Sequence, residues 1–218
     1  MINYVIFDMD GTLFDTEKLY RRTWIEMGDK WGFENIGELY PQVVGRSREL
    51  IIELMKSVYG EGYDYTEFFA ERTEYFRRLT EKEIPLKPGC FEILEFLKQN
   101  QIPCAVATST KEPVASINLK KAGVYKYFDA IVTGDMIERG KPFPDIFLKA
   151  GELLMADPDT TAVCEDSYTG ITGAHKAGMK PLMVIDLLEP TDEIRQITYA
   201  INDTLFDVID LIRKENNI

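Results

Sequence analysis

The fold is decided by one stretch near the start of the chain: Tyr4-Val5-Ile6-Phe7-Asp8-Met9-Asp10-Gly11-Thr12-Leu13-Phe14-Asp15-Thr16. Its apolar run is typical of a buried central strand in a parallel sheet. The run breaks into two aspartates one residue apart, followed by a glycine. Two carboxylates at the end of a buried strand are costly unless a metal ion or a catalytic task compensates them. Taken alone, the same residues also fit an ordinary tight turn at Asp10-Gly11.

The composition limits the class of protein. The chain has 218 residues, of which 45% are hydrophobic and 28% charged, as in a globular protein of one or two domains. Its net charge of −12 disfavours nucleic acid and anionic membranes as partners. A small anionic substrate would need local positive charge or a metal in the site. No run reaches the ~18 apolar residues of a membrane span, and no signal peptide opens the chain.

The cysteines bear on the compartment. Cys90, Cys104 and Cys164 are odd in number and far apart in the sequence. We therefore expect buried free thiols, with neither a disulfide framework nor a zinc site, in a cytoplasmic protein.

Residues 15–84 show helical periodicity and no convincing strand. Asp15 or Thr16 is expected to cap a first helix, and Ser47 a second. The apolar positions recur at helical spacing in three groups: Tyr20, Trp24, Met27 and Trp31; Leu50, Ile51, Leu54, Met55 and Val58; and Tyr65, Phe68, Phe69, Phe76 and Leu79. The segment is predicted to be a small helical domain.

After a charged, proline-bearing linker at 81–89, helices and strands alternate. Strands are expected at 102–107, 130–133, 161–164 and 181–185, and Asp145 is expected to cap the helix that follows it. This alternation predicts a doubly wound, Rossmann-like α/β parallel sheet. We expect this core to comprise residues 1–14 and 85–218, with the helical domain of 15–84 inserted.

Polar residues follow four of the predicted strands: Asp8 and Asp10; Thr108 and Ser109; Lys141, past a loop; and Glu165 and Asp166. Ligands of open parallel sheets bind outside the carboxyl ends of the strands, so these residues should converge. Clustered carboxylates favour a hard cation such as Mg²⁺, and an aspartate can attack phosphorus. A second carboxyl can then exchange protons with the leaving oxygen and with water. The pattern indicates phosphoryl transfer.

These four clusters, in this order, resemble the four motifs of the haloacid dehalogenase superfamily. The resemblance covers essentially the whole chain and includes the helical cap of the β-phosphoglucomutase-like and phosphoglycolate-phosphatase-like subgroup. It implies that Asp8 is the nucleophile and Asp10 the general acid and base. It also implies that Thr108 and Ser109 bind phosphate, that Lys141 neutralises Asp8 and phosphate, and that Mg²⁺ is held by Asp8, Asp10, Glu165 and Asp166.

Specificity is expected to come from the helical domain. The stretch Val43-Val44-Gly45-Arg46-Ser47-Arg48-Glu49 resembles a specificity loop of that subgroup, which implies that Gly45, Arg46 and Arg48, together with Thr16, contact substrate. Alternatively, both arginines belong to a solvated first helical turn. Tyr20 occupies the position at which the mutases carry a histidine. His175, the sole histidine, is expected on a helix surface.

We therefore expect a Mg²⁺-dependent phosphatase that hydrolyses a small phosphate monoester, such as a sugar phosphate, through an aspartyl-phosphate intermediate. The alternatives are a phosphomutase and a non-catalytic module that binds a phosphorylated ligand. Strand one should lie centrally, beside strands two and four. The sequence leaves the substrate and the oligomeric state open, and a monomer is compatible with it.

Overall fold

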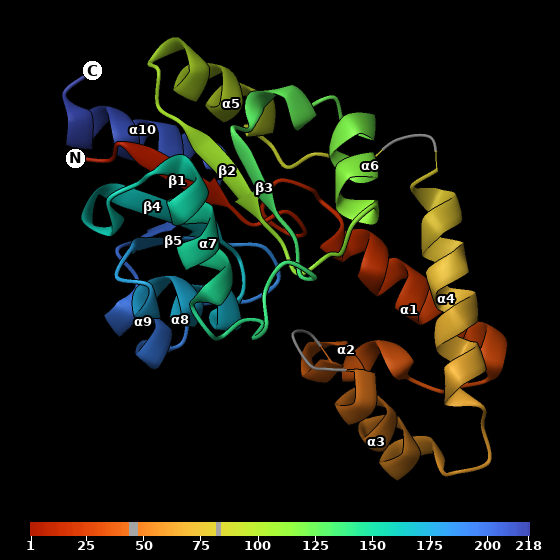
Figure 1. Cartoon of the computed structure of the whole chain (residues 1–218). Helices are drawn as coiled ribbons and strands as arrows, with labels where there is room; N and C mark the ends of the chain where they lie inside the picture. The colour runs from red at the N-terminus through yellow and green to blue at the C-terminus, as the bar shows by residue number, and fades with distance from the viewer. Residues whose placement is uncertain (44–47, 82–83) are drawn as a thin grey trace. The chain divides into compact units, whose positions relative to one another are not determined.

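The computed structural model of the chain describes residues 1–43, 48–81 and 84–218 (Figure 1). The chain divides into two compact units. The α/β unit comprises residues 1–15 and 84–218, and the helical unit comprises residues 16–83.

A six-stranded sheet in the order β3-β2-β1-β4-β5-β6 forms the centre of the α/β unit, and all its neighbouring strands are parallel. Its strands are β1 (Tyr4–Phe7), β2 (Cys104–Ala107), β3 (Ala130–Val132), β4 (Thr161–Glu165), β5 (Lys180–Val184) and β6 (Ala200–Asn202). The predicted doubly wound parallel sheet is confirmed, and β1 lies between β2 and β4 as expected. The short edge strand β6 was not predicted.

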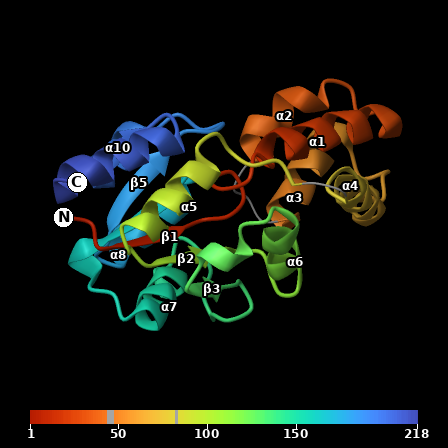
Figure 2. The same cartoon turned by 90° about the horizontal axis from the view of Figure 1, so that it is seen from above.

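Helices cover both faces of the sheet (Figure 2). One face packs against α5 (Cys90–Gln99), α6 (Val114–Lys121) and α10 (Leu205–Asn216), and the other against α7 (Asp145–Leu154), α8 (Tyr168–Lys176) and α9 (Asp192–Ile197). Two short 3₁₀ helices lie at Tyr125–Tyr127 and Pro158–Thr160. Val5 and Phe7 pack on one face of β1 and Ile6 on the other, because successive side chains alternate along a strand. A strand buried on both faces is apolar throughout, which explains the run that opens the chain.

Some helix starts differ from the sequence-based expectation. Asp145 does not cap α7: it is the first helical residue and Pro144 is the N-cap. Its carboxylate instead pairs with the guanidinium of Arg139 at 3.0 Å. The side chain of Ser167 caps α8 by accepting a hydrogen bond from the Gly170 N–H at 3.0 Å.

The helical unit contains α1 (Glu17–Trp31), α2 (Ile36–Val43), α3 (Arg48–Tyr59) and α4 (Tyr65–Leu79). Trp24, Phe33, Met55 and Phe68 are fully or almost fully buried in its core. Helix α2 was missed because it is short and contains Pro41, which normally interrupts a helix.

The apolar stripe predicted on α3 is wrong in part. Met55 is buried, whereas Leu50 and Val58 are about half exposed. Helical spacing alone does not show which apolar side chains of a helix will be covered by another helix. Ser47, the predicted cap of this helix, lies outside the described residues.

The two chain segments that connect the units are hydrogen-bonded to each other within the α/β unit. Phe14 pairs antiparallel with Leu86, and the Asp15 N–H donates to the Pro85 carbonyl at 2.8 Å. The three cysteines are free and buried, as expected. In the part of the chain that the structure describes, no helix is long and apolar enough to cross a bilayer.

Candidate active site

Asp8 stands at the carboxyl end of β1 and is 6% exposed. Its N–H continues the pairing with β4 by donating to the Cys164 carbonyl at 2.9 Å. The chain then turns sharply, since the Met9 carbonyl accepts hydrogen bonds from Leu13 at 3.0 Å and Phe14 at 2.9 Å. The segment therefore combines a buried carboxyl group at the end of a strand with the tight turn that the sequence also suggested.

Gly11 brings the end of β4 against this turn. Its φ of +86° is unfavourable for other residues, and a Cβ there would lie 2.3 Å from Oδ2 of Asp166. The hydroxyl of the neighbouring Thr12 is 3.2 Å from Oδ1 of the same carboxylate. Asp166 is therefore held directly beside the residue that follows Asp10.

Lys141 joins two of the strand ends. Its ammonium group donates to Oδ1 of Asp8 and, at 2.6 Å, to Oε1 of Glu165. The lysine side chain is 8% exposed and that of Glu165 is 1% exposed. A buried ion pair is tolerated when its remaining oxygens are also satisfied, and here Oε2 of Glu165 accepts from the N–H and the hydroxyl of Ser167, both at 2.8 Å.

The start of α8 is shaped around Glu165. A Cβ at Gly170 would lie 1.8 Å from Oε1 of Glu165, so no larger residue fits while the carboxylate keeps this place. The spacing Glu165-Asp166-Ser167-x-x-Gly170 thus has a local cause: Ser167 binds the glutamate and caps the helix, and Gly170 makes room for it.

The two buried charges influence one another. Burial raises the pKa of the Asp8 carboxyl, and the neighbouring Lys141 ammonium acts in the opposite direction. Burial would lower the pKa of Lys141, but the carboxylates of Asp8 and Glu165 outweigh it and hold that pKa above its ordinary value. Lys141 therefore remains a cation.

The end of β2 supplies hydroxyl groups. Thr108 is 1% exposed, and its Oγ1 accepts a hydrogen bond from the Thr110 N–H at 3.1 Å. Ser109 is exposed. The hydroxyl of Thr110 donates to Oδ2 of Asp10 at 2.9 Å, so this residue fixes the carboxyl to which the sequence assigns acid and base chemistry.

The core residues named from the sequence, Asp8, Asp10, Thr108, Lys141, Glu165 and Asp166, thus lie at or near the ends of neighbouring strands and are connected through these contacts. Sequence reasoning missed Thr12 and Thr110. In both cases the sequence offered the same signal, a hydroxyl residue two positions after a predicted site residue: Thr12 after Asp10, and Thr110 after Thr108.

Of the site residues predicted in the helical unit, the structure describes Thr16 and Arg48. Thr16 is buried and is the N-cap residue of α1, but its side chain does not accept the hydrogen bond from the first helical turn that a capping side chain usually accepts. Arg48 opens α3, and its guanidinium lies 5.3 Å from the centre of the Phe69 ring. Gly45 and Arg46 lie outside the described residues. His175 is exposed on α8, as expected.

Whether the site fits Mg²⁺ can be judged from the side-chain oxygens that it offers as ligands. Among residues 1–43, 48–81 and 84–218, no group of three His, Cys, Asp or Glu side chains forms a ready metal site. Mg²⁺ does not require one, because it usually binds through one or two carboxylates and completes its shell with water and substrate phosphate. The hard oxygen donors of Asp8, Asp10 and Asp166 fit that preference. Glu165, the fourth ligand predicted from the sequence, has both carboxylate oxygens hydrogen-bonded to Lys141 and Ser167 in this structure.

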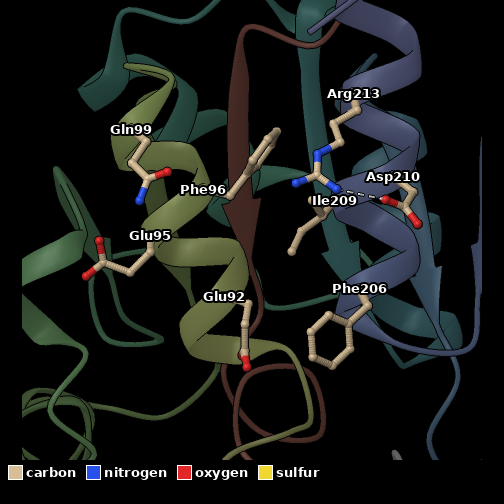
Figure 3. Close-up of a pocket in the computed structure, with 8 residues that line it drawn as sticks. All are labelled: Glu92, Glu95, Phe96, Gln99, Phe206, Ile209, Asp210 and Arg213. Carbon is tan, nitrogen blue, oxygen red and sulfur yellow. Dashed lines mark hydrogen bonds and ion pairs between the residues drawn. The ribbon is translucent and has the colours of Figure 1, made fainter.

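A separate cavity of about 400 Å³ lies between α5 and α10 (Figure 3). Phe96, Phe206 and Ile209 contribute apolar surface to it, and Glu92 and Glu95 are among its polar lining residues. None of the residues predicted from the sequence lines this cavity, so it is not the candidate active site.

Comparison with known proteins identifies the family of this chain. The haloacid dehalogenase-like hydrolase profile matches residues 5–184. The phosphorylated carbohydrates phosphatase of Thermotoga maritima is 37% identical over 178 residues, covering 81% of this chain and 82% of that protein. The fructose-1-phosphate phosphatase YqaB of Escherichia coli is 31% identical over 181 residues, covering 80% and 92%.

A solved structure shares the architecture. CbbY from Rhodobacter sphaeroides, in complex with xylulose-1,5-bisphosphate, superposes with a TM-score of 0.73 at 27% identity and covers 94% of this chain and 95% of its own. Since the profile spans most of the chain and named phosphatases are among its relatives, the chain belongs to the haloacid dehalogenase-like hydrolases and is a phosphoric monoester hydrolase.

Proposed function

We propose that the protein is a Mg²⁺-dependent phosphatase that hydrolyses a small sugar phosphate through an aspartyl-phosphate on Asp8. The observation that carries this proposal is the charge balance at the strand ends. The ammonium group of Lys141 pairs with Asp8 and Glu165. Asp10 and Asp166 follow the same two strands, β1 and β4, so four carboxylates accompany one lysine cation at these strand ends.

This balance makes a divalent cation chemically necessary for a phosphate substrate. A phosphate monoester is an anion, and an excess of carboxylates would repel it. Mg²⁺ bound by Asp8, Asp166 and the Asp10 backbone carbonyl would supply Lewis-acid stabilisation of the phosphoryl oxygens. Lys141, already paired with Asp8 and Glu165, supplies a fixed positive charge beside the nucleophile.

The residues support a two-step reaction. An Asp8 oxygen attacks phosphorus, a phosphorus–oxygen bond forms on Asp8, and the bond to the alcohol breaks. Asp10 gives its proton to the departing alkoxide. Asp10 then takes a proton from water, whose oxygen attacks the phosphoryl group and releases inorganic phosphate and a regenerated Asp8. Thr108 can donate its hydroxyl to a phosphoryl oxygen, and Thr110 holds the Asp10 carboxyl in place.

The substrate class rests on the relatives and on the helical unit. Two relatives are named as phosphatases of phosphorylated carbohydrates, which supports a sugar phosphate here. We propose that the helical unit acts as the specificity cap. Tyr20 stands where the mutase pattern has a histidine, which favours hydrolysis over phosphoryl transfer to a second sugar hydroxyl.

The test is a panel of phosphate esters, including p-nitrophenyl phosphate and fructose 1-phosphate, assayed for released phosphate with Mg²⁺ and with EDTA. We expect turnover only with Mg²⁺. In Asp8→Asn we expect the rate of phosphate release to fall about a thousandfold or more. Asp203→Asn, an exposed aspartate of the same unit, is the matched control and should retain full activity. Turnover unaffected by EDTA or by Asp8→Asn contradicts the proposal, and conversion of β-glucose 1-phosphate to glucose 6-phosphate establishes a mutase instead.

A further inference from the structure

Lys141 has a buried side chain on an exposed piece of chain. It lies in the connection from β3 to α7 (Figure 1), in which residues 133–144 form neither helix nor strand. The lysine side chain is 8% exposed, whereas the preceding Gly140 is exposed and a Cβ added there would meet no atom within 4 Å. Packing around Gly140 therefore does not fix the position of the lysine.

The position of Lys141 also cannot depend on Asp8 alone. In the proposed reaction the phosphoryl group is transferred to Asp8, so this partner of the ammonium group changes its charge and its bonding in each turnover. A cation stabilises a transition state best when it is held in place beforehand. The loop that carries Lys141 therefore needs contacts that take no part in the reaction.

Arg139 and Asp145 provide such a contact, one on either side of the lysine in the chain. Nε of Arg139 donates to Oδ1 of Asp145 at 3.0 Å, and Nη2 donates to Oδ2 at 3.0 Å. Two parallel hydrogen bonds of this kind fix the orientation of both groups as well as the distance between them. Asp145 is the first residue of α7, whose Ile146 and Phe147 are fully buried, so the ion pair ties the loop to a helix that is anchored in the core.

The ring of Phe143 gives the loop a second set of contacts. The guanidinium of Arg139 lies 4.7 Å from the centre of this ring, and Nζ of Lys176 on α8 lies 5.8 Å from it. Lys176 also donates to the Pro142 carbonyl at 3.3 Å. Within the loop, the Phe143 N–H closes a turn by donating to the Gly140 carbonyl at 3.0 Å. The loop is thus attached to α7 through Arg139 and to α8 through Lys176.

These contacts lie at the surface, which determines what they can do. The side chain of Arg139 is 58% exposed and that of Asp145 is 20% exposed. An exposed ion pair contributes little to the stability of a whole fold, but it can still order the loop that it closes. We therefore expect a change at Arg139 to alter the local opening of the loop and to leave the melting temperature almost unchanged.

We propose that Arg139 is a positioning residue for Lys141. Its contacts with Asp145 and Phe143 hold the loop so that the lysine cation stays beside Asp8 while the phosphoryl group is transferred. The inference rests on the proposed function only in that Lys141 acts there on the phosphoryl group. It adds a residue outside the strand ends and a restraint on one cation of the site.

Arg213 offers a matched control in the same unit. Its guanidinium pairs with Asp210 at 3.2 Å, lies 5.3 Å from the centre of the Phe96 ring, and belongs to a side chain that is 54% exposed. Arg213→Met therefore removes the same kinds of contact as Arg139→Met, at a similar exposure, on a helix far in sequence from the loop.

Hydrogen exchange tests the loop without any substrate. Exchange is followed by mass spectrometry on peptides that contain Phe143, whose N–H is hydrogen-bonded within the loop. The lost ion pair and ring contact together should make this exchange about three- to thirtyfold faster in Arg139→Met. Arg213→Met should exchange in this segment as the wild type does, and the two variants should melt within about 2 °C of each other.

Steady-state kinetics test the consequence for catalysis. With p-nitrophenyl phosphate and Mg²⁺, Arg139→Met should lower kcat about three- to tenfold and change KM less than about twofold, because Lys141 acts on the phosphoryl group in transfer. Arg139→Lys keeps the charge but lacks the forked donor, so its kcat should lie between those of Arg139→Met and the wild type. Adding Asp145→Asn to Arg139→Met should lower kcat no further, since both changes remove one contact.

The inference is overturned by unchanged exchange in Arg139→Met, by faster exchange with an unchanged kcat, by equal losses in Arg213→Met, or by fully additive losses in the double variant. If Arg139→Met does not fold, as judged by circular dichroism, Arg139→Lys carries the same comparisons. If the wild type hydrolyses no ester, the proposed function fails, and hydrogen exchange still decides whether Arg139 orders the loop.

Discussion

Replacing Lys141 with methionine should destabilise the protein in a pH-dependent way. The side chains of Lys141, Asp8 and Glu165 are 8%, 9% and 1% exposed, so water cannot take the place of the lost ammonium. Removing one partner of a buried ion pair costs about 3–5 kcal/mol, because the other charge is left uncompensated. Domains are stable by only about 5–15 kcal/mol, so the variant should fold with little margin.

The sign of the pH dependence follows from Asp8. Burial raises the pKa of this carboxyl and Lys141 opposes that rise, so removing Lys141 moves the pKa of Asp8 in the folded protein upwards. A carboxyl whose pKa is higher in the folded than in the unfolded state contributes stability at low pH that is lost as pH rises through its folded-state pKa. Without Lys141 the pKa rises further, so the deficit of Lys141→Met relative to wild type should grow between pH 6 and pH 9.

Urea unfolding followed by far-UV circular dichroism, in EDTA, measures this deficit at both pH values. We expect a difference of about 1 kcal/mol or more between them, since each unit of pKa shift corresponds to about 1.4 kcal/mol. Lys149→Met, at a more exposed lysine paired with Glu152 at 2.8 Å, should change stability little at either pH. An equal deficit at pH 6 and pH 9, or no deficit, would refute the reasoning from buried charge.

Two further predictions concern the contacts around the site. Gly170→Ala places a methyl group 1.8 Å from the Glu165 carboxylate, so we expect a loss of about 1–3 kcal/mol in the free energy of unfolding together with lower activity. Gly62→Ala is the control, because a Cβ added there would meet no atom within 4 Å, and it should leave the free energy of unfolding unchanged. Equal melting temperatures for both variants would contradict the packing argument. Thr110→Val removes the donor at 2.9 Å from Asp10 and should lower kcat about tenfold with little change in KM; an unchanged kcat, measured by phosphate release, would show that Asp10 does not need this contact.

Much of the α/β unit could be predicted because its signals are local. A strand buried on both faces must be apolar, so β1 and β4 were recognisable from short runs of residues. The carboxyl ends of parallel strands share one edge of a sheet, so residues more than a hundred positions apart, such as Asp8 and Lys141, could be assigned to one site. The contact between these two side chains bears out that geometric argument.

The errors have physical causes as well. Helix α2 contains Pro41, and its packing in the helical core overrides the local signal against a helix. Asp145 has the residue type of a helix cap, but Arg139 competes for its carboxylate. Leu50 and Val58 fit an apolar stripe yet remain exposed, because periodicity describes one helix and burial needs a second surface.

The sequence by itself determined the central strand, the turn after it and the set of carboxylates, because an apolar run that ends abruptly in charged residues is characteristic of a buried strand with a functional carboxyl end. Only the tertiary structure decided how the charges are shared. Lys141 holds Asp8 and Glu165, Thr110 holds Asp10, and Thr12 holds Asp166. Such pairings depend on distances of about 3 Å between elements remote in the chain, and no local propensity encodes them.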